Sequence, residues 1–161
     1  TFKLSFDNDY NPNKKYYETY NISSKGEYEC KRVLENIFDR PFNKARPAFL
    51  NNSVTGHNLE LDCYNPELKI ACEYNGEQHY RFIPFFHKSK EFFTHQKYRD
   101  YMKRNLCEKE GIFLIEVPYT IQIPEIESYI KDKLLQNYKQ NKVNSSRNNL
   151  DLDLDIDIEN S

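Results

Sequence analysis

The alternation of apolar and polar positions predicts the first half of the fold. A Ser-x-Gly-Glu sequence at 24–27 has the form of a helix-capping box, and apolar residues follow at helical spacing to about residue 38. Two alternating runs, 59–64 and 68–74, predict antiparallel strands joined by a tight Asn-Pro turn. A short extended piece at 42–46 comes before them, between two prolines.

Helical spacing returns in the second half of the chain. Residues 95–110 place four apolar side chains on one stripe, and Gly111 is a suitable C-cap. Residues 112–117 form a short apolar run that predicts a strand, and Pro124 opens a last amphipathic helix. The predicted order is helix, strand, strand, strand, helix, strand, helix, which indicates an α/β fold.

The two ends of the chain differ in composition from this central part. Residues 1–22 are polar and tyrosine-rich without clear periodicity, which predicts a loose N-terminal arm. Asn, Lys and Ser dominate 139–149, so we expect a flexible linker there and a folded domain spanning 23–138. The tail 150–161 alternates between acidic and apolar residues as an edge strand does, but repulsion between its acids favours disorder.

Composition limits the class of protein. With 161 residues the chain fits one domain, and 13 Tyr and 11 Phe supply apolar area for a core despite a mean hydropathy of −0.91. No apolar run approaches the ~20 residues of a membrane span. The first residues also lack the features of a secretory signal. We therefore expect an intracellular protein with no membrane partner.

Charge and cysteines narrow the candidate partners only slightly. The net charge is −2, but five acids fall in the tail, which leaves 23 basic against 20 acidic residues, or +3, in 1–149. A mildly basic domain is compatible with nucleic-acid binding without requiring it. The four cysteines form no CxxC or Cys/His zinc pattern. We therefore expect reduced, buried thiols rather than disulfides or a zinc site.

Two carboxylates in the predicted hairpin are the strongest candidates for chemistry. Strand parity and the tight turn place Asp62 opposite or diagonal to Glu73, at a Cα separation of about 5 to 8 Å. Two acids aimed at one point repel each other unless a cation lies between them, and Mg²⁺ prefers oxygen ligands. The pair predicts a site for Mg²⁺, for which Mn²⁺ can substitute, although exposed strand faces often carry acids for solubility alone.

Polar residues after this pair extend the candidate site. The turn that follows Glu73 holds Asn75, Gln78 and His79, and an imidazole is suited to orient or deprotonate a water. The second long helix carries a stripe of amide, carboxylate and cationic side chains: Gln96, Asp100, Lys103 and Arg104. If this helix lies beside the hairpin, its cations can contact a phosphate; otherwise the stripe is an ordinary exposed face.

These residues, in this order, resemble the motifs of a nuclease superfamily. The motifs are Ser24-x-Gly26-Glu27, Leu61-Asp62, the run 73–80 (Glu-Tyr-Asn-Gly-Glu-Gln-His-Tyr), Arg99-Asp100-x-x-Lys103 and the run 111–119. They resemble the PD-(D/E)XK nucleases, and within them the very-short-patch-repair-type and EDxHD homing endonucleases of phages and large DNA viruses. The resemblance covers residues 23 to about 135 and implies a restriction-endonuclease-like αβββαβ core, with a mixed central sheet flanked by helices.

The resemblance also implies roles for particular residues. It places Glu27 on the first helix of the site, Asp62 as the principal metal ligand, and His79 in the water-activating position. Asp100 lies on the second long helix. Asn75 stands where the superfamily's E-x-K sequence has its lysine, and an amide cannot supply that positive charge, so we expect Lys103 to substitute.

The expected function is a metal-dependent endonuclease that hydrolyses phosphodiester bonds in double-stranded DNA, by nicking or cleavage of homing or repair type. The expected catalytic set is Glu27, Asp62, Glu73, His79, Asp100 and Lys103. The metal ligands in it are Asp62 and Glu73. The expected substrate-binding residues are Asn75, Gln78, Gln96 and Arg104.

Other readings of the same residues remain open. Asn75 keeps open a catalytically inactive DNA-binding or virion-associated protein with the same fold. Sequence preference is expected to come from the arm at 1–22 and the aromatic segment 80–93. The resemblance implies a viral or phage source and a location in the cytoplasm or nucleus of an infected cell, or in the virion.

Overall fold

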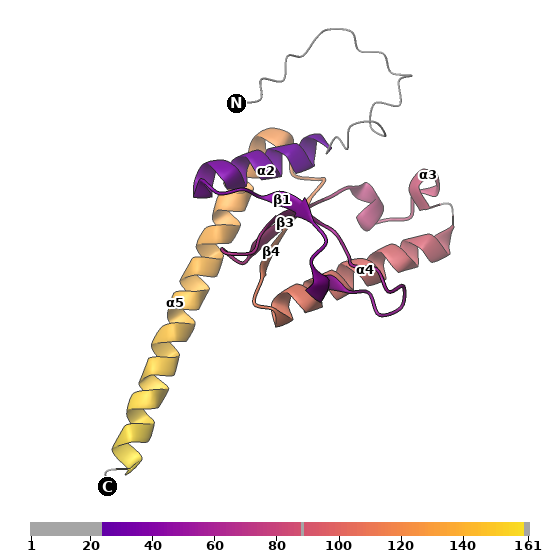
Figure 1. Cartoon of the computed structure of the whole chain (residues 1–161). Coiled ribbons are helices and arrows are strands. Elements are labelled where there is room, and N and C mark those ends of the chain that lie inside the picture. Colours follow the sequence, from indigo (N-terminus) through magenta and orange to yellow (C-terminus); the bar gives the residue numbers. More distant parts are fainter. Residues whose placement is uncertain (1–23, 88, 160–161) are drawn as a thin grey trace.

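A four-stranded mixed sheet forms the centre of the molecule (Figure 1). The computed structural model describes residues 24–87 and 89–159. The strands lie in the order β1 (Asn43–Ala45), β2 (Leu61–Asn65), β3 (Ile70–Asn75) and β4 (Phe113–Pro118). β1 pairs with β2 and β2 with β3 in antiparallel fashion, whereas β3 and β4 are parallel.

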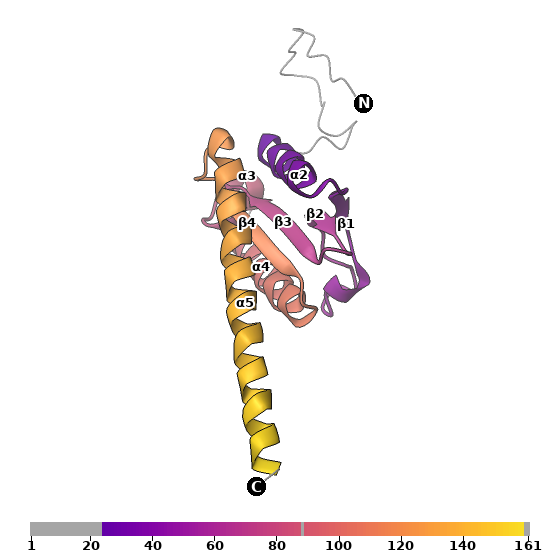
Figure 2. The ribbon, with the colours of Figure 1, turned by 90° about the vertical axis from the view of Figure 1, so that its left-hand side faces the viewer.

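Helices cover both faces of this sheet (Figure 2). α2 (Lys25–Phe38) and α5 (Ile126–Glu159) pack together on one face. α4 (Lys90–Lys109) lies on the other face, preceded by the short α3 (Pro84–His87). Because β3 and β4 are parallel, the chain must cross from one end of the sheet to the other between them, and α4 makes that crossing.

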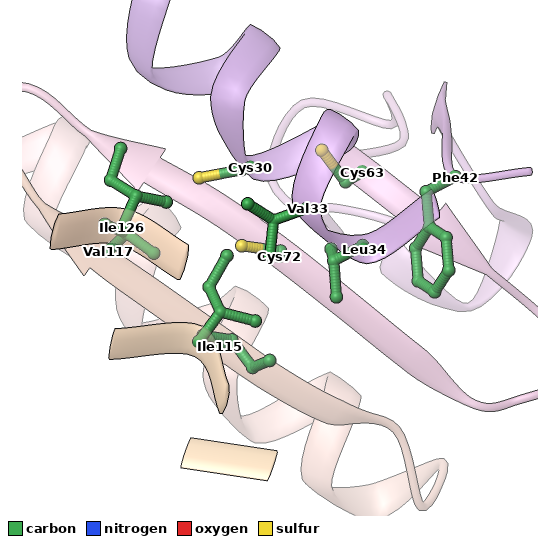
Figure 3. Close-up of a cluster of buried hydrophobic side chains, with 10 residues drawn as sticks. Cys30, Val33, Leu34, Phe42, Cys63, Cys72, Ile115, Val117 and Ile126 are labelled. Carbon is green, nitrogen blue, oxygen red and sulfur yellow. The ribbon is translucent and has the colours of Figure 1, made fainter. Parts of the chain in front are cut away.

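The larger core lies between the sheet and the pair of helices α2 and α5 (Figure 3). Apolar residues at helical spacing on α2 meet those from alternate positions of β2, β3 and β4. All four cysteines are free and buried, which confirms the expectation of reduced thiols. The fully buried members of this core are Cys30, Val33, Leu34, Phe42, Cys63, Cys72, Ile115, Val117, Ile126 and Ile130.

A smaller core lies on the opposite face, beneath α4. Cys107 of α4 packs with Ala71 of β3, and Met102 lies at the edge of the same cluster. Its other buried members are Leu50 and Leu59 of the β1–β2 connection, Leu61 of β2 and Ile112. This packing fixes α4 against the sheet and so sets which of its polar residues approach β2 and β3.

The expected order of elements is confirmed, and the α/β fold class with it. Several boundaries differ from the sequence expectation. α4 begins at Lys90 rather than at residue 95, after Ser89 as N-cap residue. The aromatic segment 80–93 therefore contains α3 and the first turn of α4.

The expectation of a flexible linker at 139–149 is wrong, because α5 continues without interruption to Glu159. Residues 126–159 contain neither Gly nor Pro, so nothing in this stretch breaks the backbone hydrogen-bond ladder. The acidic tail is correspondingly helical up to Glu159, and neither an edge strand nor disorder. The predicted arm at 1–22 lies outside the described residues.

None of the helices in the described part of the chain combines the length and apolar character needed to cross a bilayer.

Gly26 allows α2 to approach β3 closely. A Cβ atom at this position would lie 2.4 Å from three atoms of the Tyr74 ring. We expect Gly26→Ala to lower the free energy of unfolding by about 1 to 3 kcal/mol, since the ring or the helix must shift. Chemical denaturation measures this, with the exposed Lys25→Ala as the matched control. In a Tyr74→Leu background the cost of Gly26→Ala should shrink, and an undiminished cost would contradict the close approach as its cause.

Candidate active site

One polar cavity of about 530 Å³ opens on the α4 side of the sheet. β2 and β3 contribute Asp62 and Glu73, α4 contributes one wall, and the connection between β1 and β2 contributes another. The residues of the expected site that line it are Glu27, Asp62, Glu73, Gln78, His79, Gln96, Asp100 and Lys103. Elements distant in sequence therefore bring most of the predicted residues to one place.

Asp62 and Glu73 lie next to each other where β2 and β3 separate. The antiparallel ladder pairs Cys63 with Cys72. Asp62 is the residue before Cys63 and Glu73 the residue after Cys72, so the two acids are neighbours at the same end of the ladder. Glu73 Oε1 accepts a hydrogen bond from the Asp62 amide at 3.2 Å, and Asp62 Oδ2 accepts one from the Tyr74 amide at 3.0 Å. The two backbone amides thus bind carboxylate oxygens instead of carbonyl oxygens of the neighbouring strand. Both acids line the cavity.

Lys103 reaches this pair from α4. Its Nζ lies 2.9 Å from Glu73 Oε2, with only 13% of the lysine side chain and 7% of the glutamate side chain exposed. The structure therefore places the Lys103 ammonium at the acidic pair. Both Glu73 oxygens are occupied, whereas Asp62 Oδ1 accepts no hydrogen bond from any residue that the structure describes.

The surroundings of the pair disfavour two negative charges. Burial raises the pKa of Glu73 to about 7, with the Lys103 ammonium opposing that shift and the Asp62 carboxylate adding to it. Burial also raises the pKa of Asp62, and repulsion from Glu27 acts in the same direction. The cavity therefore holds more carboxylate than its own cations neutralise.

His79 and Asp100 form a second group beside the acidic pair. His79 Nδ1 lies 2.9 Å from Asp100 Oδ2, and Gln96 Nε2 donates to Asp100 Oδ1 at 3.1 Å. Gln96 Nε2 also lies 3.2 Å from His79 Nδ1, so this nitrogen faces both an acceptor and a donor. In the tautomer with the proton on Nδ1, the imidazole donates to Asp100 and its lone pair is at Nε2. Asp100 and Gln96 together fix the direction of the imidazole.

Glu27 enters the cavity from the first turn of α2. The Ser24 hydroxyl accepts a hydrogen bond from the Glu27 amide at 3.2 Å, which confirms one half of the predicted capping box. The Glu27 carboxylate contacts Lys44 Nζ at 3.3 Å instead of returning to Ser24. This side chain is thereby held at the cavity, close enough to influence Asp62.

Two of the expected substrate-binding residues lie elsewhere. Asn75 is buried, and its Nδ2 donates to Glu116 Oε1 at 3.2 Å. Arg104 Nε donates to Glu116 Oε2 at 2.7 Å. Neither side chain lines the cavity, so the structure does not bring them together with the other expected site residues. Both side chains bind Glu116 of the neighbouring strand β4. Glu116 lies next to Asn75 because β3 and β4 pair in parallel.

Sequence reasoning also missed one side of the cavity. Arg46 and Glu60 line it and form an ion pair at 3.0 Å, and Glu60 also lies 3.5 Å from Lys44. Residues of the connection 51–58 line it as well. The composition of this connection predicted a loop, but it gave no sign that the loop lines the cavity.

A metal ion at this site would rely on few protein ligands. Among residues 24–87 and 89–159, no group of three or more His, Cys, Asp or Glu side chains is arranged to hold a metal. Asp62 and Glu73 are two oxygen donors on one side of the sheet, which suits a hard cation that keeps several waters. The donor chemistry therefore fits Mg²⁺ or Mn²⁺ better than a metal that needs nitrogen or sulfur ligands.

The raised pKa of Glu73 predicts a pH dependence of stability. An unfolded glutamate has a pKa near ~4.3. Between that value and about 7 the folded chain retains a proton that the unfolded chain has lost, so stability falls as pH rises. We expect the Tm without divalent ions to fall by several degrees from pH 5 to pH 8, and by less in Glu73→Gln. Thermal melts check this, with the exposed Glu91→Gln as control; equal losses in Glu73→Gln and wild type would contradict the assignment.

Comparison with known proteins finds relatives in viruses. The chain is 53% identical over 111 residues to "Uncharacterized protein 033L" of Invertebrate iridescent virus 3, across 69% of this chain and 57% of that protein. It is 49% identical over 126 residues to "Uncharacterized protein 307L" of Invertebrate iridescent virus 6, across 69% and 63%. The chain thus spans less than two thirds of either protein's length. No protein-family profile and no solved structure matches it.

A third relative is covered more completely. The chain is 45% identical over 112 residues to "Uncharacterized protein 094L" of Frog virus 3 (isolate Goorha), across 69% of this chain and 71% of that protein. Identity at this level over most of the relative's length reflects common descent. The chain therefore belongs to the family of viral proteins that includes protein 094L of Frog virus 3.

Proposed function

We propose that this chain is a metal-dependent endonuclease that hydrolyses phosphodiester bonds in double-stranded DNA. The supporting observation is that one cavity collects the Asp62 and Glu73 carboxylates, the Lys103 ammonium and the pair of His79 with Asp100. Phosphodiester hydrolysis needs an oriented water and neutralisation of the charge that develops on the phosphate. These residues supply both functions within one open, polar space.

The metal is assigned to Asp62 and Glu73. Asp62 Oδ1 has no hydrogen-bond donor among the described residues, and the pKa of each acid is raised. Burial is the main cause of both shifts and repulsion from neighbouring carboxylates adds to it, so a cation at this position would favour the ionised acids. Mg²⁺, or Mn²⁺ in its place, supplies positive charge next to the phosphate when bound.

His79 is assigned to the water. With Asp100 holding Nδ1, the Nε2 lone pair of the neutral imidazole is available to orient a water and accept its proton. Gln96 binds Asp100 and so helps to hold the carboxylate in place. Asp100 and Gln96 are positioning residues in this scheme, because they act through His79.

Lys103 is assigned to the phosphate. In the structure it neutralises Glu73, and a cation bound between the two acids would take over that task. The ammonium is then available to contact a phosphate oxygen from the α4 wall. Lys103 thus performs, from a helix, the task of the lysine that Asn75 replaces on β3.

A second candidate function is supported by Asn75 itself. Its side chain is buried against Glu116 and supplies no charge to the cavity. A chain that keeps the nuclease-like site without its usual lysine can also serve as a non-cleaving DNA-binding or virion-associated protein. Cleavage of supercoiled plasmid with Mg²⁺, compared with EDTA, decides between the two functions. In either case we place its action inside the infected cell or the virion.

Asp62→Asn tests the proposed metal site. We expect it to abolish nicking of plasmid DNA, a loss of at least about a hundredfold, because it removes a metal ligand. DNA affinity should be equal or higher, because one negative charge near the phosphates is lost. Gel assays of nicking and fluorescence anisotropy of DNA binding measure the two effects separately.

The matched control for this variant is Asp132→Asn on the exposed surface of α5. It makes the same chemical change away from the cavity and should cut at the wild-type rate. Near-native cutting by Asp62→Asn would reject Asp62 as a metal ligand. Loss of cutting together with loss of DNA binding would point to a folding defect, which a thermal melt detects.

Lys103→Met tests whether Lys103 takes the role of the lysine that position 75 lacks. We expect cleavage to fall by about a hundredfold, as when one group that stabilises the transition state is removed. DNA affinity should fall much less, since a single phosphate contact is lost. Lys109→Met, in the exposed last turn of α4, is the control. Equal cleavage rates for Lys103→Met and Lys109→Met would assign the phosphate contact to another residue.

A further inference from the structure

The cavity has two walls that differ in charge. The α4 wall carries the Arg99 and Lys103 cations, together with the His95 imidazole and the Tyr98 ring. Another part of the lining is the loop of residues 51–58, which contains no Lys, Arg, Asp or Glu and whose base lies next to the Arg46–Glu60 ion pair. It lines the cavity with amide, hydroxyl, imidazole and apolar groups, from Asn52, Val54, Thr55, His57 and Asn58.

Hydrogen bonds hold the 51–58 loop in one conformation. The Asn52 amide donates to the His57 carbonyl at 2.9 Å, and the Gly56 amide donates to the Asn52 carbonyl at 2.7 Å. Asn51 Nδ2 donates to the Gly56 carbonyl at 3.2 Å, and Asn51 also forms a β-bridge with Asn58. Gly56 has a φ of 74°, a left-handed conformation that glycine adopts without strain. The loop is thus built before any ligand binds.

The base of the loop is also anchored. Arg46 Nη1 donates to the Asn58 carbonyl at 3.2 Å, and the same guanidinium binds Glu60. The Leu59 amide donates to the Leu50 carbonyl at 2.8 Å, and both leucines belong to the smaller core. Movements of the loop are therefore resisted by the same packing that positions α4.

The tip of this rigid loop presents an apolar side chain to solvent. Val54 is 77% exposed, more than any other exposed large hydrophobic residue in the described part of the chain. A single exposed valine needs no explanation by itself. Here it stands between neutral hydrogen-bonding groups at the edge of the cavity that holds Asp62 and Glu73.

The two walls match the two parts of a DNA strand. Cationic side chains bind phosphates and fix the orientation of the protein, whereas amides, hydroxyls and methyl groups distinguish base edges. The aromatic segment 80–93, which was expected to contact bases, does not line the cavity. The 51–58 loop is the part of the cavity whose chemistry suits bases.

We propose that the 51–58 loop reads the bases beside the cut site, with Val54 against the apolar edge of a base, such as the thymine methyl group in the major groove. Thr55 and His57 lie on either side of Gly56 and supply hydrogen bonds to neighbouring base edges. Arg99 and Lys103 hold the phosphate backbone at the α4 wall. This inference rests on the proposed endonuclease function, because it takes DNA to lie across this cavity.

A binding selection tests the loop directly. Duplexes of randomised sequence are bound to the full chain carrying Asp62→Asn, so that the DNA remains intact, and bound and input pools are sequenced. We expect a base preference that Val54→Ala weakens about fivefold at one or two positions. The salt slope of log K should not change, because no phosphate contact is lost. Val143→Ala, an exposed valine on α5, is the matched control and should keep the preference.

Arg99→Gln provides the opposite pattern. It should weaken binding to all sequences alike and reduce the salt slope by about 1, while the base preference stays. Thermal melts of each variant show whether it is folded. Val54 packs against little, so its replacement should leave the Tm unchanged.

The outcomes separate this inference from the proposed function. An unchanged preference in Val54→Ala, or no preference before the change, overturns the role of the loop. If the wild-type chain still cuts plasmid DNA with Mg²⁺, the endonuclease function stands without the loop. Absence of both binding and cleavage rejects the two proposals together.

Discussion

The register of β2 against β3 is the constraint on which both the core and the cavity depend. Cys63 lies opposite Cys72, and both thiols enter the core beneath α2 (Figure 3). Asp62 and Glu73 come one residue further along and therefore enter the opposite face, beside α4. A slip of one residue would turn the acids into the apolar core. The packing of the core thus selects the register that brings the two carboxylates together.

Lys103 compensates for the burial of this carboxylate pair. A buried charge without a partner costs several kcal/mol, and Glu73 is 5% exposed. The ammonium reaches Glu73 only because α4 is fixed along the sheet, and Cys107, four residues later, makes that contact with the smaller core. Apolar packing on one stripe of α4 therefore positions the charge on the next stripe. The ion pair between Lys103 and Glu73 therefore fixes where the two charges lie, and it adds little to the free energy of unfolding.

The sequence contained the local part of this arrangement. Alternation in 59–64 and 68–74 was sufficient to place Asp62 beside Glu73, because strand parity and a short turn leave few registers. The polar stripe of α4 was visible too, but not which residue faces the cavity. Arg104 follows Lys103 by about 100° around the helix, which turns it towards Glu116 on β4. The pairing of Arg104 with Glu116 and the position of the 51–58 loop at the cavity both depend on packing between segments distant in sequence, so local patterns could not predict them. The length of α5 was missed because Asn and Ser suggest a linker, although the stretch holds no helix breaker.

Under the proposed function, Lys103 on α4 supplies the ammonium that a lysine at position 75 would supply, and the chemistry of an ammonium permits this. A point charge on a flexible four-carbon stem has few directional demands, so it can reach the same oxygen from a strand or from a helix. Carboxylate ligands are more restricted, because two of them must converge from fixed backbone positions. On this argument the acids of such a site must keep their places on adjacent strands, whereas the lysine is free to move between elements. Asn75 does not line the cavity, and its side chain donates instead to Glu116 of the parallel neighbouring strand β4.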